Sequence, residues 1–160
     1  MTSIQVLLGI AVVSTGLFTG LLMTVLFFFE RALKDLSGPE FATVMQRFLK
    51  ITCTHPLNYA MVLISGLTPL AVLVMMHESP GSPSFVLTTS GLLAFWCGSS
   101  LPSTFIAQPL YGVFMSWEID APPQDWREAR ERYFRVNVVR GLGSAIAFVC
   151  FVIAAMILPL

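Results

Sequence analysis

Four long stretches of apolar residues, separated by short polar segments, dominate the chain. A helix needs about 20 mostly apolar residues to cross the roughly 30 Å of hydrocarbon in a bilayer, and each stretch is long enough. Because lipid offers no hydrogen-bond partners, a spanning segment satisfies its backbone groups as a helix. We therefore predict an all-α, integral membrane four-helix bundle in which residues 1–160 form a single domain. The predicted spans are residues 4–29, 56–76, 85–107 and 136–158.

The polar segment after the first span has a helical pattern of its own. Ser37 and Glu40 have the Ser-x-x-Glu spacing of a capping box, which marks the start of a helix. The apolar residues that follow fall on one helical face: Phe41, Val44, Met45, Phe48 and Leu49. We predict a short amphipathic cytoplasmic helix over residues 39–53, lying on the inner leaflet or packed under the bundle. A lid over an internal site is the alternative.

The positions of the basic residues predict the orientation of the spans. All of them lie in two regions, after the first span and around the start of the fourth: Arg31, Lys34, Arg47, Lys50, Arg127, Arg130, Arg132, Arg135 and Arg140. Loops rich in Lys and Arg stay in the cytoplasm. We therefore predict an up-down-up-down bundle in a bacterial inner membrane, with both termini outside, in the periplasm. The fourth helix is expected to begin with a cytoplasmic extension over residues 123–135.

Composition narrows the classes of function. Hydrophobic residues make up 56% of the chain and charged residues 11%, and nine Lys and Arg balance nine Asp and Glu. Without a net positive charge we expect no nucleic-acid partner. The two histidines, His55 and His77, belong at opposite membrane faces, and the cysteines are isolated in the sequence. We therefore predict neither a metal site nor a bound cofactor.

Polar residues near the cytoplasmic ends of the spans mark a candidate site. An ionisable group inside a membrane is costly, about 2.5–3.5 kcal/mol for Arg on insertion scales, and indicates a functional site. We predict a cytoplasm-facing polar pocket for a hydrophobic aromatic or quinone-like molecule. In this pocket His55 is expected to act as a base or hydrogen-bond partner, while Arg140 and Asn137 hold an oxyanion or phenolate oxygen. The other residues expected to contact the ligand are Glu30, Asn58, Gln108, Tyr111 and Tyr133.

Two further expectations concern contacts within the membrane. Glu30 is the expected ion-pair partner of Arg140, with Glu118 as second choice. Gly16 and Gly20 have the spacing that lets helix backbones approach closely, within the bundle or in a homo-oligomer. A buried polar network that only sets the register of the helices is the alternative to a pocket.

The start of the fourth span carries a short motif. Trp126 is followed by the aromatic and basic run Arg132–Arg135, and then by Asn137 and Arg140. This segment resembles the last span of the anthrone-oxygenase-like family of four-span membrane proteins, most of which are labelled as domains of unknown function. In that family an aromatic and basic run is followed by Asn, two residues, and Arg.

The resemblance implies an activity. Characterised members oxidise anthrones to anthraquinones with O₂, without an evident metal or flavin. It therefore implies an oxidoreductase in which the protein supplies a base, an oxyanion partner and a dry pocket. The sequence departs from the family pattern at His55, Ala107 and Tyr111, where members often carry Asn.

A non-catalytic role is the alternative to an enzyme. A small chain with a projecting helix at residues 123–135 also fits a small subunit or assembly factor of a larger membrane protein complex. The expected partners are membrane lipid, a hydrophobic small molecule, and further membrane chains in a homo-oligomer or a larger complex.

Overall fold

The computed structural model describes residues 2–158, and within them every regular element is a helix. Three single π-helical turns, labelled η, interrupt the α-helices, and each widens its helix by one extra residue per turn. In chain order the elements are α1 (Ser3–Thr24), η1 (Val25–Phe29), α2 (Glu30–Leu33), α3 (Gly38–Thr52), α4 (Pro56–Met75), α5 (Pro83–Phe95), η2 (Trp96–Ser100), η3 (Ser103–Ala107), α6 (Gln108–Met115) and α7 (Trp126–Ile157).

Consecutive elements join into four long helical segments. Each is long and apolar enough to cross a membrane, which confirms the prediction of an all-helical protein with four candidate spans and indicates an integral membrane protein. The segments are Ser3–Leu33, Pro56–Met75, Pro83–Met115 and Trp126–Ile157. The fourth begins at Trp126, so the expected extension over residues 123–135 is helical only from that residue onward.

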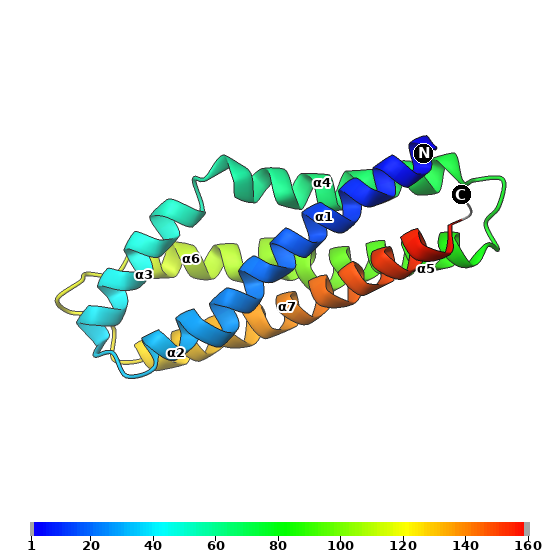
Figure 1. Cartoon of the computed structure of the whole chain (residues 1–160). Helices are drawn as coiled ribbons and strands as arrows, with labels where there is room; N and C mark the ends of the chain where they lie inside the picture. Colours follow the sequence, from blue (N-terminus) through cyan, green and yellow to red (C-terminus); the bar gives the residue numbers. More distant parts are fainter. Residues whose placement is uncertain (1, 159–160) are drawn as a thin grey trace.

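The long helices pack side by side along one axis (Figure 1). α7 contacts both α1 and α5, and α4 contacts the same two helices. Both termini and the turn between α4 and α5 lie at one end of the molecule, which we call the terminal end (Figure 1). The turn between α2 and α3 and the loop before α7, residues 34–37 and 116–125, lie at the opposite end, which we call the loop end.

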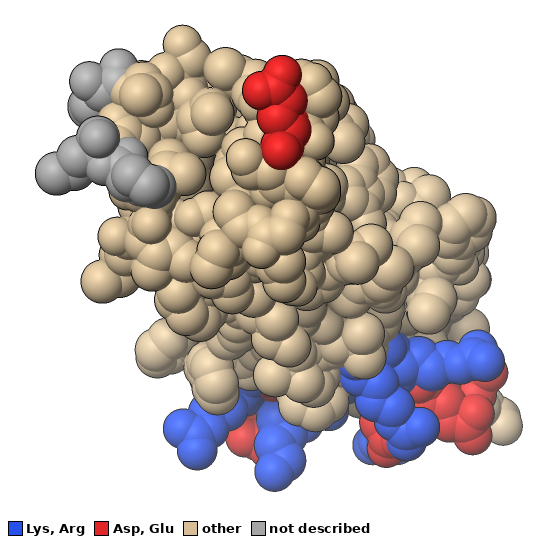
Figure 2. All heavy atoms as spheres, turned by 90° about the vertical axis from the view of Figure 1, so that its right-hand side faces the viewer, with Lys and Arg blue, Asp and Glu red and all other residues tan. Residues whose placement is uncertain are grey.

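Charged side chains gather away from the terminal end. Figure 2 views the molecule from the terminal end, and the facing surface is almost free of charge except for one acidic group near its upper edge. The Lys and Arg side chains and most acidic ones appear along the lower edge of the same view (Figure 2). In the chain, the basic residues belong to α2 and the turn after it, to α3, and to the first half of α7.

α3 packs beneath the loop end of the bundle. The buried Phe41 ring stacks near Phe114 of α6 and Trp126 of α7, with centroid distances of 5.7 and 5.4 Å. The Gln46 side-chain amide donates to the backbone oxygens of Phe114 and Trp117, at 3.0 and 2.9 Å. Carbonyl groups at a helix end lack partners within the helix, so Gln46 caps the end of α6. These contacts fix α3 to the third and fourth long helices.

Ser37 and Glu40 form the start of α3. The Ser37 hydroxyl and the Ser37 backbone N–H both donate to Glu40 Oε2, at 2.6 and 2.8 Å. These two hydrogen bonds stabilise the charged carboxylate and lower the pKa of Glu40 below its ordinary value of 4.5. A carboxyl group with a lowered pKa in the folded state stabilises that state at neutral pH, and the contribution is lost as the pH falls through 4.5 and below.

The start of α3 is therefore expected to loosen in acid, and Glu40→Gln is expected to remove that pH dependence. Glutamine has no titrating group, so its weaker cap does not change between pH 7 and acid. The measurement is amide hydrogen exchange in the first turns of α3, corrected for the intrinsic effect of pH. Glu128→Gln, which changes an exposed carboxylate on α7, is the matched control and should behave as the wild type. Equal acid sensitivity in Glu40→Gln and wild type would contradict this role.

α7 and η2 approach each other closely at two glycines. A Cβ atom added to Gly143 would lie 2.5 Å from the backbone carbonyl carbon of Gly98, and one added to Gly98 would lie 2.7 Å from Gly143 Cα. Backbone atoms cannot move aside as a side chain can, so only glycine fits at either position. The expected contact at Gly16 and Gly20 is only half present: Gly16 lies against the Phe148 ring, whereas Gly20 faces open space.

Candidate functional site

A cavity of about 520 Å³ lies between the helices, in the half of the bundle near the loop end. All four long helices and α3 contribute to its wall, including residues of the π-helical turns η1 and η3. Its volume falls within the range of small-molecule sites in proteins, about 300–1,000 Å³. Its polar lining residues are Thr52, Cys53, Asn58, Tyr59, Ser103, Gln108, Tyr111, Tyr133, Asn137 and Arg140.

Arg140 and Asn137 form the polar centre of this cavity. They lie one helical turn apart on α7, so both side chains project from the same face. Arg140 Nη1 donates to Asn137 Oδ1 at 2.8 Å and to the Tyr111 hydroxyl oxygen at 2.9 Å. The two side chains are buried, with 7% and 1% of their surface exposed. Asn137 thus uses its only acceptor to hold the arginine in place.

The hydrogen-bonding capacity of this pair is not exhausted. Arg140 Nε and Asn137 Nδ2 are buried and have no partner within the described residues. No carboxylate oxygen of residues 2–158 lies within 4.0 Å of the Arg140 guanidinium. A buried cation is costly unless an anion or several acceptors compensate it. The wall of the cavity therefore contains a buried positive charge and two buried nitrogen atoms, Arg140 Nε and Asn137 Nδ2, without an acceptor among residues 2–158.

Two tyrosines form an aromatic wall beside Arg140. Tyr133 of α7 is 2% exposed and its ring centroid lies 6.2 Å from that of Tyr111. Tyr133 also packs edge-on against Phe114, at 5.9 Å. The Tyr111 hydroxyl accepts from Arg140, which leaves its own proton available for donation. The wall therefore combines flat apolar surface with the phenolic O–H groups of Tyr111 and Tyr133.

Asn58 and Gln108 lie at the margin of the cavity, as expected from the sequence. Asn58 Nδ2 donates to the backbone oxygen of Thr52 at 3.3 Å, which connects the start of α4 to the end of α3. Gln108 lines the cavity but is largely exposed. The structure thus brings six of the expected site residues to one cavity: Asn58, Gln108, Tyr111, Tyr133, Asn137 and Arg140.

The expected ion pair between Glu30 and Arg140 is wrong. Glu30 Oε1 instead accepts from Arg130, with an Nη2–Oε1 distance of 3.0 Å. Arg130 also donates to the backbone oxygen of Lys34 at 3.1 Å, so this pair joins α2 to α7. Glu118, the second choice, is an exposed residue of the loop before α7. Glu30 lies outside the residues that line the cavity.

His55 also lies outside the cavity. Pro56 begins α4, and His55 is the extended residue before it, in the N-cap position. Its Nδ1 accepts a hydrogen bond from the Leu57 backbone N–H at 3.3 Å, so the imidazole lies over the start of its own helix. It borders a neighbouring, almost entirely apolar surface hollow, which shares Leu21, Thr52 and Asn58 with the cavity. The structure therefore does not bring the expected base to Arg140.

α3 forms part of the cavity wall, although none of its residues is among the site residues expected from the sequence. Phe48, Leu49 and Thr52 line it, followed by Cys53 at the end of the helix. The signal was present, because Thr52 continues the helical spacing of Phe48 and Leu49. Burial raises the pKa of the Cys53 thiol, and contacts with Thr52 and the positive charge of Arg140 oppose this only in part. Cys53 is therefore a protonated thiol at neutral pH.

The described part of the chain contains no cluster of side chains that could ligate a metal ion. Among residues 2–158 no three His, Cys, Asp or Glu side chains lie close enough together to hold a metal ion. The cavity itself contains one thiol and no histidine or carboxylate in its lining. Its chemistry therefore comes from N–H and O–H donors, aromatic rings and apolar surface.

Comparisons with protein-family models, with curated proteins and with solved structures found no match. The resemblance of the fourth span to the anthrone-oxygenase-like family stays a prediction made from short motifs.

Proposed function

We propose that the cavity binds a hydrophobic aromatic or quinone-like molecule through an oxygen atom placed against Arg140 and Asn137. One observation carries this proposal: among residues 2–158, the buried Arg140 has no carboxylate partner, and its Nε–H and the Asn137 amide N–H have no acceptor. A phenolate or carbonyl oxygen would supply the missing acceptor and, if ionised, the missing negative charge. The remaining lining is largely apolar and aromatic, which suits the body of such a molecule.

The proposal extends to the placement of the protein. We place both termini outside a bacterial inner membrane, with an up-down-up-down bundle and α3 as an amphipathic helix on the cytoplasmic side. Support comes from the basic residues, which all lie toward the loop end or in α7 near the cavity. In this orientation the cavity lies near the inner leaflet, where a hydrophobic ligand concentrates.

Binding of the ligand is the primary proposed function. Oxidation of the bound ligand by O₂ is a second proposed function of the same site. The Asn137–Arg140 pair supports it, because two donors near the oxygen stabilise the anion that forms when an anthrone loses a proton to water. The anion would then take up O₂, and loss of one water molecule would give the anthraquinone. His55 has no part in this version, since it caps α4 outside the cavity. The alternative of a small subunit in a larger complex predicts instead a stoichiometric partner after purification in mild detergent.

Protection of Cys53 from alkylation tests where the ligand binds. Cys53 lines the cavity, whereas Cys97 is exposed outside it. In a Cys97→Ala/Cys150→Ala background, a monohydroxyanthraquinone at ten times its dissociation constant is expected to slow alkylation of Cys53 by a neutral maleimide about tenfold. This probe carries a phenolic oxygen and does not add thiols to its ring.

Two controls make the experiment specific. Anthracene has the same three-ring body without oxygen and should protect Cys53 much less at equal concentration. In the reciprocal Cys53→Ala/Cys150→Ala background, alkylation of Cys97 should be unchanged by either compound. Equal protection by anthracene would show that the oxygen of the ligand does not contribute to binding. No protection at saturation would show that the ligand does not bind in this cavity.

A further inference from the structure

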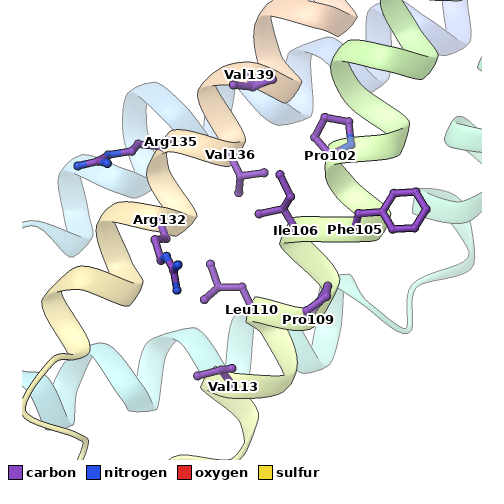
Figure 3. Close-up of a pocket in the computed structure, with 10 residues that line it drawn as sticks. All are labelled: Pro102, Phe105, Ile106, Pro109, Leu110, Val113, Arg132, Arg135, Val136 and Val139. Carbon is purple, nitrogen blue, oxygen red and sulfur yellow. The ribbon is translucent and has the colours of Figure 1, made fainter.

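A second hollow lies outside the cavity, between α7 and the third long helix. It has a volume of about 510 Å³ and opens on the surface of the bundle (Figure 3). Its floor is apolar, and residues of η3 and α6 face residues of α7 across it (Figure 3). Pro102 and Pro109 lie on either side of the π-helical turn η3, where the helix is wider than an α-helix. In a membrane this hollow is in contact with lipid chains.

A positive charge closes one end of this hollow. Arg132 reaches from α7 toward Leu110 of α6, while Arg135 extends from another side of the same helix (Figure 3). Arg135 is already paired with Glu131, at 3.1 Å. No carboxylate oxygen of residues 2–158 lies within 4.0 Å of Arg132, so its charge is not compensated by the protein.

We propose that this groove binds one anionic phospholipid, with its phosphate on Arg132 and an acyl chain along the apolar floor. The occupant follows from the charges: an unpaired guanidinium at the end of an apolar groove matches a molecule with an anionic head and an apolar tail. A zwitterionic lipid fills the floor equally well but brings its own cation near Arg132. The site is separate from the cavity around Arg140, because the two hollows share no lining residue.

Native mass spectrometry in detergent tests this proposal. The probes are phosphatidylglycerol and phosphatidylcholine with identical acyl chains, added to the full chain at equal concentrations. Phosphatidylglycerol is expected to bind about fivefold more tightly to the wild type, the effect of one basic residue at the membrane surface. Arg132→Gln should remove this preference. Arg127→Gln, an exposed arginine on the same helix outside the groove, should keep it.

A second pair of variants tests the apolar floor. Ile106→Trp fills the groove and is expected to weaken the binding of both lipids. Ile146→Trp, on an exposed part of α7 outside the groove, should leave the binding of both unchanged. Glycerol phosphate, which has the anion without the chains, should not compete with phosphatidylglycerol. No lipid preference in the wild type, a preference that survives Arg132→Gln, or an equal loss in Arg127→Gln would each overturn the proposal.

Discussion

Substitution of Arg140 by leucine is expected to weaken binding of the monohydroxyanthraquinone strongly while the protein stays folded. Hydrogen bonds to charged groups contribute about 1.5–3 kcal/mol each, so loss of the guanidinium should lower the affinity at least about 10- to 100-fold. Arg140 has no carboxylate partner in the described part of the chain, and its burial therefore costs free energy in the unliganded protein. Leucine removes that cost but leaves Asn137 Oδ1 without its donor, and because these two effects oppose each other the thermal unfolding temperature should change little.

The combination of the two measurements separates a binding residue from a structural one. If Arg140 only sets the register of the helices, Arg140→Leu should lower both the amount of folded protein and its unfolding temperature. Asn137→Leu tests the same binding role independently. It removes the unpaired amide donor and the oxygen that accepts from Arg140. Arg47→Gln, an exposed arginine on α3, is the matched control and should change neither binding nor stability. Unchanged affinity in stable Arg140→Leu protein would contradict the proposed site.

The contact between Gly98 and Gly143 is expected to be the most sensitive point of the fold. Gly143→Ala forces the backbones of α7 and η2 apart, because its Cβ would lie 2.5 Å from a backbone carbon. Overpacking of this kind costs about 1–3 kcal/mol for small additions, and more where backbone must move. Gly143→Leu should therefore prevent accumulation of folded protein, and Gly143→Ala should lower the unfolding temperature measured by circular dichroism in detergent.

Two other glycines provide the controls for this experiment. A Cβ atom added to Gly9 or Gly20 meets no atom within 4 Å, and both residues lie inside α1. Because alanine favours the helix over glycine by up to about 1 kcal/mol, Gly9→Ala and Gly20→Ala should leave stability unchanged or raise it. If Gly20→Ala lost as much stability as Gly143→Ala, the Gly98–Gly143 contact would not be the most sensitive one, and the Gly16–Gly20 face would be equally important.

The membrane-like fold could be predicted from the sequence, because runs of apolar residues and the cost of unpaired backbone groups decide it locally. The Asn137–Arg140 pair could be predicted as well, since two residues three apart on one helix share a face. The partner of Glu30 could not, because several arginines at the start of α7 lie at a similar height and only the rotation of the helices selects Arg130. The same rotation decides that Gly143 meets Gly98.

His55 lies outside the cavity for a local reason. The residue before a proline at the start of a helix takes an extended backbone, and its side chain is then well placed to cap that helix. A His-Pro pair at the head of a span is therefore better interpreted as a cap than as a catalytic base. The π-helical turns add a second source of error, since each shifts the following residues around the helix axis relative to regular α-helical counting.

The position of α3 has a consequence for how a ligand enters and leaves the cavity. Part of the cavity wall belongs to this short helix and not to the four long ones. α3 is held by the Gln46 amide and by a cluster of rings around Phe41, and its flanking segments are only a few residues long. Outward tilting of this one element would uncover the chamber from the aqueous side while the long helices keep their mutual packing. In the orientation proposed above, loading and release would then depend on a helix outside the bilayer, with no rearrangement of the long helices.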